Sequence, residues 1–429
     1  MIRSSSHLLL LLSGLVLAAA CDHEAVLRLR LDVRAPPGPD PYAGAVTARI
    51  AVDGVVIASG PYSGSGSLAG LELSAPSIEG GARVALELLD ATGAVVSRGS
   101  ARMRDDEEPT RLMLRRAGAF SATLGPLGST RVAARTALAS DAVWLVGGDA
   151  HAFSTAVDRI DGDTTLIERK PALVTPRVAP VAVFAPEGSL VVLGGGAAGA
   201  EVLAPEAEAF TTHAGVPHLG SWAGVVASGA GTWTVAGGGT ADVFALRWAE
   251  GAPNVTAMPP LRTSRGRVTL LRLGERTLAV GGSPTSLAEW VDNSSPPLTE
   301  PVVIPAAVSA DRLDTTHAVV VALAERTVMV LDAKGGLTVA GALARGRASG
   351  AALTLESGLL LVIGGEGDAA GSAERWRWAD GQLTFEDEIA LFGKHKSAVV
   401  ARLPSGGALV AGGTDALGVY APIGAVYEP

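Results

Sequence analysis

Cysteine, lysine and aromatic residues are scarce in this chain of 429 residues. Its single cysteine, Cys21, excludes a framework of internal disulfides and a zinc site built from several cysteines. Lysine occurs only at positions 170, 334, 394 and 396, and aromatic residues make up 4% of the chain. Charged residues make up 18%, with a formal net charge of −9, which argues against a protein that binds nucleic acid by neutralising phosphates.

Apolar residues, glycine and proline are abundant instead. The chain is 48% apolar and holds 54 glycines and 25 prolines. A disordered Gly/Pro-rich chain has far less Val, Leu and Ala, so we expect a folded protein. The length suggests about two or three domains. After the N-terminus, no apolar run is long enough to span a membrane, so we expect a soluble body.

The first twenty residues have the layout of a secretory signal. Arg3 supplies the positive charge, and an apolar core of 13 residues runs from Leu8 to Ala20, too short for a spanning helix. The segment Leu17-Ala18-Ala19-Ala20-Cys21 resembles the lipobox of bacterial lipoproteins. That resemblance implies cleavage before Cys21, acylation of Cys21, and a place in the cell envelope on a lipid anchor, with residues 21–25 as a short tether. The alternative is an ordinary signal peptide that leaves Cys21 as a free thiol.

Residues 26–117 are predicted to form a β-sandwich of immunoglobulin-like type. From Val26 to Val33, apolar and polar residues alternate with period two, as in a half-buried strand. The Pro/Gly run from Pro36 to Pro41 ends this strand. Further short strands, with no helical period between them, are expected near residues 46–52, 55–59, 67–73, 82–89, 95–103 and 111–115.

Residues 118–429 contain a repeat of about 44 residues. A short apolar run that ends in Gly-Gly recurs with its first glycine at positions 147, 194, 237, 281, 364 and 412. The gap between 281 and 364 equals two periods, and Val319-Val320-Val321 fits the missing run. Each period holds four strand-like segments, and a period of this size indicates a propeller or a solenoid. The sequence predicts an all-β chain with seven propeller blades, or alternatively six.

The chain ends after the third strand of the last copy. Residues 119–124, which precede the first copy, have the pattern of an outer strand. We therefore expect them to supply the fourth strand of the last blade and to close the ring without an open edge.

The repeats resemble the kelch family in its bacterial form. The second copy carries the family pattern most fully, with Arg177, Pro186-Glu187-Gly188, Gly194-Gly195 and Leu203-Ala204-Pro205. The resemblance covers about Ala119 to Pro429 and implies a β-propeller; no activity is carried over from it.

Candidate binding residues follow from the repeat. Arg177, Arg347 and His395 each lie 17 residues before a first glycine. Equivalent positions of different blades line one mouth of a propeller channel, where convergent cations can bind an anionic ligand such as an acidic sugar or a carboxylate. The alternative is that they tie adjacent blades together by hydrogen bonds. Six tryptophans are candidates for stacking on sugars, with packing between blades as the alternative: Trp222, Trp233, Trp248, Trp290, Trp376 and Trp378.

The sequence shows no catalytic, metal-binding or cofactor motif. It lacks His-Glu-x-x-His, Gly-x-Ser-x-Gly and a Walker loop. Asp158, Asp161 and Asp163 suggest a calcium loop, but Asp161-Gly162 also suits a hairpin turn. We therefore expect no enzyme and no cofactor, but a lipid-anchored envelope protein that binds a protein or a glycan, or is purely structural. The alternative is a lyase or hydrolase that acts on envelope polysaccharide.

Overall fold

The computed structural model describes residues 31–63, 81–103, 109–148, 154–283, 287–291, 302–305, 308–415 and 417–429. These residues form an all-β structure, as the sequence predicts, and the one helix among them is the short 3-10 helix η1 (Gly367–Gly371). Cys21, the tether, the strand expected at 67–73 and the first part of the strand expected from Val26 lie outside the described residues.

Two small sheets form the N-terminal part. A parallel pair of strands packs over a five-stranded sheet of order β3-β2-β4-β5-β7. Burial alternates along the strands that face each other, so Leu31, Ile50, Leu86 and Leu112 share one hydrophobic core. The strands are β1 (Leu31–Arg34), β6 (Thr110–Met113), β2 (Thr47–Val52), β3 (Val55–Pro61), β4 (Arg83–Leu89), β5 (Val95–Arg102) and β7 (Arg115–Arg116).

Seven four-stranded sheets follow, numbered here as sheets 1 to 7 along the chain. Sheet 1 contains β9 (Arg135–Leu138), β10 (Ala142–Val146), β11 (Val157–Asp161) and β12 (Ile167–Arg169). Sheet 2 contains β13 (Val181–Phe184), β14 (Leu190–Leu193), β15 (Ala200–Leu203) and β16 (Thr211–His213). Sheet 3 contains β17 (Ala223–Gly229), β18 (Thr232–Gly237), β19 (Val243–Ala249) and β20 (Ala252–Met258). Sheet 4 contains β21 (Thr269–Leu273), β22 (Arg276–Val280), β23 (Leu287–Trp290) and β24 (Val302–Val303).

The last three sheets complete the series. Sheet 5 contains β25 (Val308–Arg312), β26 (His317–Ala322), β27 (Thr327–Asp332) and β28 (Leu337–Ala342). Sheet 6 contains β29 (Ala351–Thr354), β30 (Leu359–Ile363), β31 (Ser372–Ala379) and β32 (Gln382–Ala390). Sheet 7 contains β33 (Val399–Arg402), β34 (Ala408–Ala411), β35 (Ala425–Glu428) and β8 (Ala119–Ala122).

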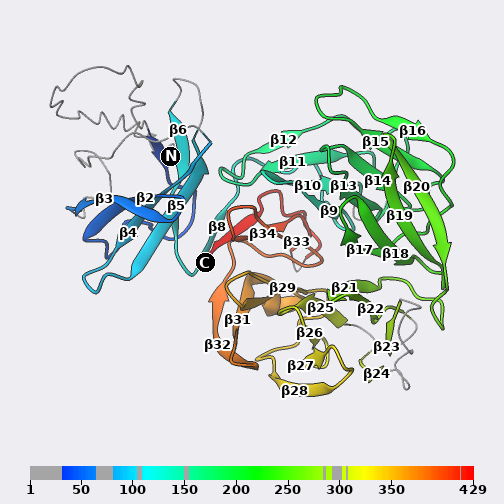
Figure 1. Cartoon of the computed structure of the whole chain (residues 1–429). Helices are drawn as coiled ribbons and strands as arrows, with labels where there is room; N and C mark the ends of the chain where they lie inside the picture. The colour runs from blue at the N-terminus through cyan, green and yellow to red at the C-terminus, as the bar shows by residue number, and fades with distance from the viewer. Residues whose placement is uncertain are drawn as a thin grey trace.

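The seven sheets close into a ring (Figure 1). The first strand of each sheet contacts the first strand of the next, and β33 of sheet 7 contacts β9 of sheet 1. A separate hydrophobic cluster fills each interface between neighbouring sheets, including the interface between sheets 7 and 1. Second strands such as β14 and β30 are buried along their whole length because they are covered on both faces, which accounts for their unbroken apolar sequence.

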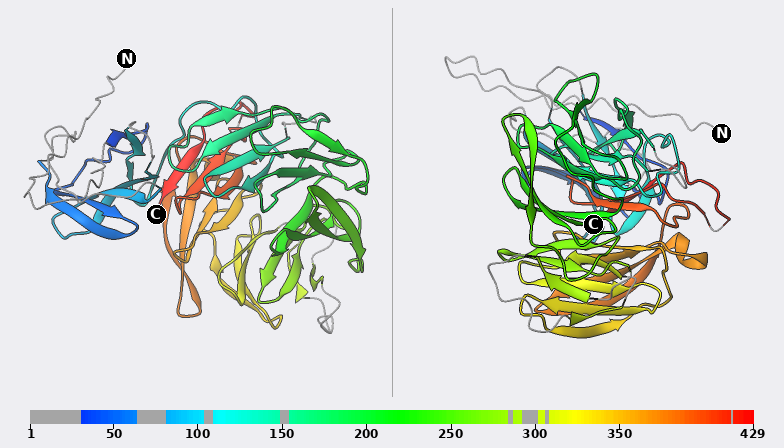
Figure 2. Two further views of the ribbon diagram at one scale, coloured as in Figure 1. Left: turned by 45° about the horizontal axis from the view of Figure 1, so that its top comes forward. Right: turned by 90° about the vertical axis from the view of Figure 1, so that its right-hand side faces the viewer.

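Strand β8 completes sheet 7 from the other end of the repeat region. It pairs antiparallel with β35, so that Ser121 lies opposite Val426 and Phe120 opposite Tyr427. The N-terminal part therefore joins the ring beside sheet 7, and both views of Figure 2 show it there. Arg83 and Arg115 of the N-terminal part also reach sheet 1, through Asp163 and Thr165.

The Gly-Gly pairs stand where the second strands end. Gly195 has φ +72°, and a Cβ there would come within 2.9 Å of the Cβ of Arg177. Gly365 has φ +130°, and its Cβ would lie 2.8 Å from the Cα of Arg347. Only glycine combines this conformation with so close an approach. Sheet 5 has no Gly-Gly pair, and its second strand β26 contains the Val319–Val321 run expected from the doubled gap.

Candidate functional site

The cations predicted at the channel mouth are buried and fully engaged with the protein. Arg177 is 1% exposed, Arg347 0% and His395 1%. Each lies in the connection that enters a sheet and bonds to the carbonyl of that sheet's first glycine. The distances are 2.5 Å from Arg177 Nη1 to Gly194 O, 3.1 Å from Arg347 Nη1 to Gly364 O, and 2.9 Å from His395 Nδ1 to Gly412 O.

Sequence analysis missed two members of this set, Arg131 and Arg265. Both are 0% exposed, and each donates from Nη1, at 3.0 Å, to the first glycine of its sheet, Gly147 or Gly281. They lie 16 rather than 17 residues before that glycine, so a search at one fixed spacing passes over them. Allowing one residue of slack reveals the same position in five of the seven sheets.

A buried carboxylate on the third strand of the same sheet pairs with each of the four arginines. The partners are Asp158 on β11 for Arg131, Glu201 on β15 for Arg177, Glu289 on β23 for Arg265, and Glu374 on β31 for Arg347. These contacts are those of the alternative role, in which the side chain ties the entering connection to the second and third strands. An arginine whose donors face protein carbonyls and a buried carboxylate offers no free charge to a ligand. The binding role of Arg177, Arg347 and His395 stays a prediction that these contacts do not support.

The three aspartates of the suggested calcium loop face different partners. Asp158 pairs with Arg131 and Arg169, and Asp163 pairs with Arg83 at 2.8 Å. Asp161 Oδ1 accepts from the backbone N–H of residues 163 and 164, as in a hairpin turn. In the part of the chain that the structure describes, no group of three His, Cys, Asp or Glu side chains is placed to hold a metal ion.

A groove of about 910 Å³ opens between sheets 1 and 2, which is within the range of small-molecule sites. Trp144 of β10 and Phe184 of β13 form its aromatic floor, with ring centroids 5.6 Å apart in an edge-to-face arrangement. Both rings are half-buried, so each presents part of its surface to the groove. The turns at its rim carry the exposed carboxylates of Asp141, Glu206 and Glu208.

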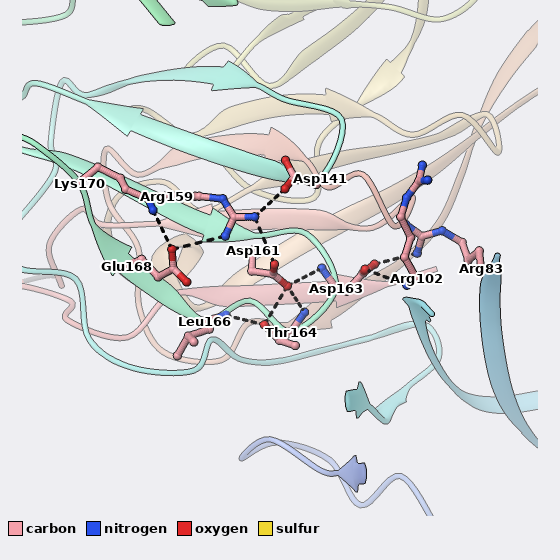
Figure 3. Close-up of polar contacts among 10 residues, drawn as sticks. All are labelled: Arg83, Arg102, Asp141, Arg159, Asp161, Asp163, Thr164, Leu166, Glu168 and Lys170. Carbon is pink, nitrogen blue, oxygen red and sulfur yellow. Dashed lines mark hydrogen bonds and ion pairs between the residues drawn. The ribbon is translucent and has the colours of Figure 1, made fainter. Parts of the chain in front are cut away.

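One wall of the groove is an ordered chain of charges on sheet 1 (Figure 3). Arg159 bonds to Asp141 at 2.7 Å and also contacts Glu168, which pairs with Lys170 at 3.0 Å. These carboxylates raise the pKa of Arg159 above its ordinary value, although burial opposes the shift. Lys170 Nζ also lies 5.9 Å from the centre of the Trp144 ring. The wall thus holds planar polar groups in fixed positions beside an aromatic surface.

Comparisons with known proteins give a likeness of fold. No protein-family model matches the chain, and no curated protein sequence matches it. Among solved structures, a streptogramin B lyase is similar with a TM-score of 0.53 and 13% sequence identity, covering 72% of this chain and 98% of the lyase chain. At this identity the likeness bears on fold alone. The ring of this chain is therefore similar to a β-propeller.

Proposed function

We propose that the protein is a non-catalytic binding module of the bacterial cell envelope, which presents a seven-bladed propeller of kelch type on an N-terminal β-sandwich. The closed ring of seven four-stranded sheets and the Gly-Gly pairs support the propeller assignment. The groove between sheets 1 and 2 is the observation that carries the binding role.

The groove suits a glycan better than a protein surface. It is concave and ligand-sized, whereas protein partners bury broad patches of about 800 Å² on each side. The C–H face of a sugar ring packs on an aromatic surface such as Trp144, and sugar hydroxyls donate to carboxylates such as Glu206 and Asp141. All of these groups line the same groove. An envelope saccharide is therefore the proposed ligand.

The predicted lipobox supports attachment to a membrane through lipid on Cys21. Among the described residues no helix has the length and apolar character needed to cross a membrane. Several acyl chains on one residue anchor a protein stably where a single chain is marginal. Cys21→Ser is expected to move the protein from the membrane fraction to the soluble fraction, and a variant that stays with the membrane would contradict the proposal.

Replacing Trp144 with leucine is expected to weaken glycan binding about tenfold or more, because the substitution removes the stacking surface from the groove. The measurement is a binding screen of the purified protein against bacterial envelope glycans and periplasmic proteins, followed by calorimetric titration of each binder. Trp248→Leu is the matched control, because Trp248 is also half-buried but lies on sheet 3, away from the groove.

Two outcomes overturn the proposal. One is a panel with no glycan binder, and the other is equal loss of affinity in the Trp144 and Trp248 variants. Turnover of any polysaccharide in the same screen would favour the alternative, an enzyme that acts on envelope polysaccharide.

A further inference from the structure

Arg135, Trp222 and Arg267 meet at the inner edge of the ring. The guanidinium carbon of Arg135 lies 5.1 Å from the centre of the Trp222 ring, and that of Arg267 lies 4.2 Å from it. Arg135 is the first residue of β9 in sheet 1, and the other two residues precede the first strands of sheets 3 and 4. Sheets 1 and 4 are not neighbours, so their side chains reach one tryptophan only where the first strands converge on the central channel.

The backbone confirms that Trp222 and Arg267 belong to the channel mouth. Each lies two residues after the tie position of its sheet and has positive φ, +68° and +55°. Equivalent residues are joined around the ring, because Trp222 N donates to Ala179 O at 3.0 Å and Ala179 N donates to Ala133 O at 2.8 Å. The other described members of this set carry small side chains and also have positive φ: Ala133, Ala179, Ser349 and Ser397.

No anion of the protein offsets the two charges. Among the described residues, neither Arg135 nor Arg267 has a carboxylate within ion-pair distance or donates a side-chain hydrogen bond. Burial and the charge of Arg267 lower the pKa of Arg135 to about 10, so both side chains remain cationic at neutral pH. The contrast with the four tie arginines is complete, since each of those has its own carboxylate.

A small cavity adjoins this cluster. It measures about 230 Å³ and is lined by the first strands β9, β13 and β17, beginning at Thr136, the residue after Arg135. Its walls are mostly apolar, with Ala182, Val225 and Trp233 among them. The space suits a short apolar group beside a charged one.

We propose that Arg135 and Arg267 form an oxyanion site at the channel mouth, which takes a small ligand through a carboxylate, phosphate or sulfate group. A guanidinium presents paired N–H donors in a plane that matches the oxygens of such groups, and Trp222 fixes the position of both guanidinium groups through cation–π contacts. An oxyanion between them relieves the repulsion of two like charges brought close together. This site is separate from the groove and does not depend on glycan binding.

The test is calorimetric titration of the purified protein with three probes at matched low ionic strength: glucuronate, inorganic phosphate and sulfate. We expect at least one probe to bind, with affinity that falls as salt is added. Arg135→Gln and Arg267→Gln are each expected to weaken that binding about tenfold or more. The preferred probe identifies whether the group is a carboxylate or a tetrahedral anion.

Controls separate a binding role from a folding role. Removing one of two neighbouring cations relieves repulsion, so both variants are expected to unfold at the same denaturant concentration as the parent or higher. Arg247→Gln, on an exposed position of β19, is expected to leave anion binding unchanged, as is Trp144→Leu in the groove. Absence of binding by every probe, or equal affinity in the parent and the Arg135 and Arg267 variants, would overturn the proposal, whatever the outcome of the glycan screen.

Discussion

Replacing Arg347 with methionine is expected to lower the free energy of unfolding by about 3–5 kcal/mol, as is typical when one partner of a buried ion pair is removed. Arg347 is 0% exposed and pairs with Glu374, which is also 0% exposed, at 3.1 Å. It also donates to the carbonyl groups of Gly364 and Ser372. Methionine leaves Glu374 as a buried charge without its cation and leaves both carbonyls without this donor.

Urea unfolding of three variants checks this result. The exposed pair of Arg377 and Glu386 lies on the same sheet, so Arg377→Met serves as the control and is expected to cost less than about 1 kcal/mol. The double variant with Arg347→Met and Glu374→Leu is expected to recover much of the loss, because no buried charge remains unpaired. The role assigned to the tie arginines would be wrong if Arg347→Met cost no more than Arg377→Met.

Between pH 5 and pH 8 the protein is expected to lose stability through Glu428, by up to roughly 3 kcal/mol. Burial raises the pKa of this carboxyl on β35 to about 7, and the charges of Arg115 and Arg98 oppose that rise only in part. Because the folded state binds the proton more tightly than the unfolded state, this stabilisation is complete below the ordinary pKa of about 4.5. It is lost progressively as pH rises through 7.

Glu428→Gln is expected to flatten this pH dependence and to make the protein more stable than the parent at pH 8. Unfolding by urea at pH 5, 6, 7 and 8 measures the difference between the two proteins, in which the titration of other groups cancels. Glu356→Gln is the control, because Glu356 is exposed on the turn before β30. Parent and Glu428→Gln curves with the same slope would show that Glu428 does not titrate in this range.

The repeat period was enough to predict most of the fold. A fixed spacing between Gly-Gly pairs places every second strand, and the doubled gap locates β26 although it lacks the glycines. The early outer strand was predictable because the last copy lacks one, and the structure places β8 in sheet 7. Strand ends shifted by one or two residues where turns decide them, as at β3, which runs on to Pro61. The expected strand 111–115 is split into β6 and β7, which belong to different sheets.

The candidate sites were less predictable. The 17-residue spacing found Arg177, Arg347 and His395 at equivalent positions, but spacing gives no information on whether a side chain meets solvent or a carboxylate on the third strand. Trp144 and Phe184 come from two sheets, and their groove depends on how those sheets diverge at their outer ends. The same limit applies to Arg135 and Arg267, which meet Trp222 only because the ring is closed.

Closure of the ring by β8 is the central claim, because the groove and the channel mouth both require it. The most direct test introduces Ser121→Cys and Val426→Cys together, in a Cys21→Ser background. These two positions are opposite each other on β8 and β35, within the range that a disulfide spans. The account predicts an intramolecular disulfide in the oxidised native protein, seen as two linked peptides after proteolysis. It also predicts no such link for Ser121→Cys with Ala425→Cys, whose side chains point to opposite faces. Failure of the 121–426 link, or links between molecules only, would contradict the closed ring.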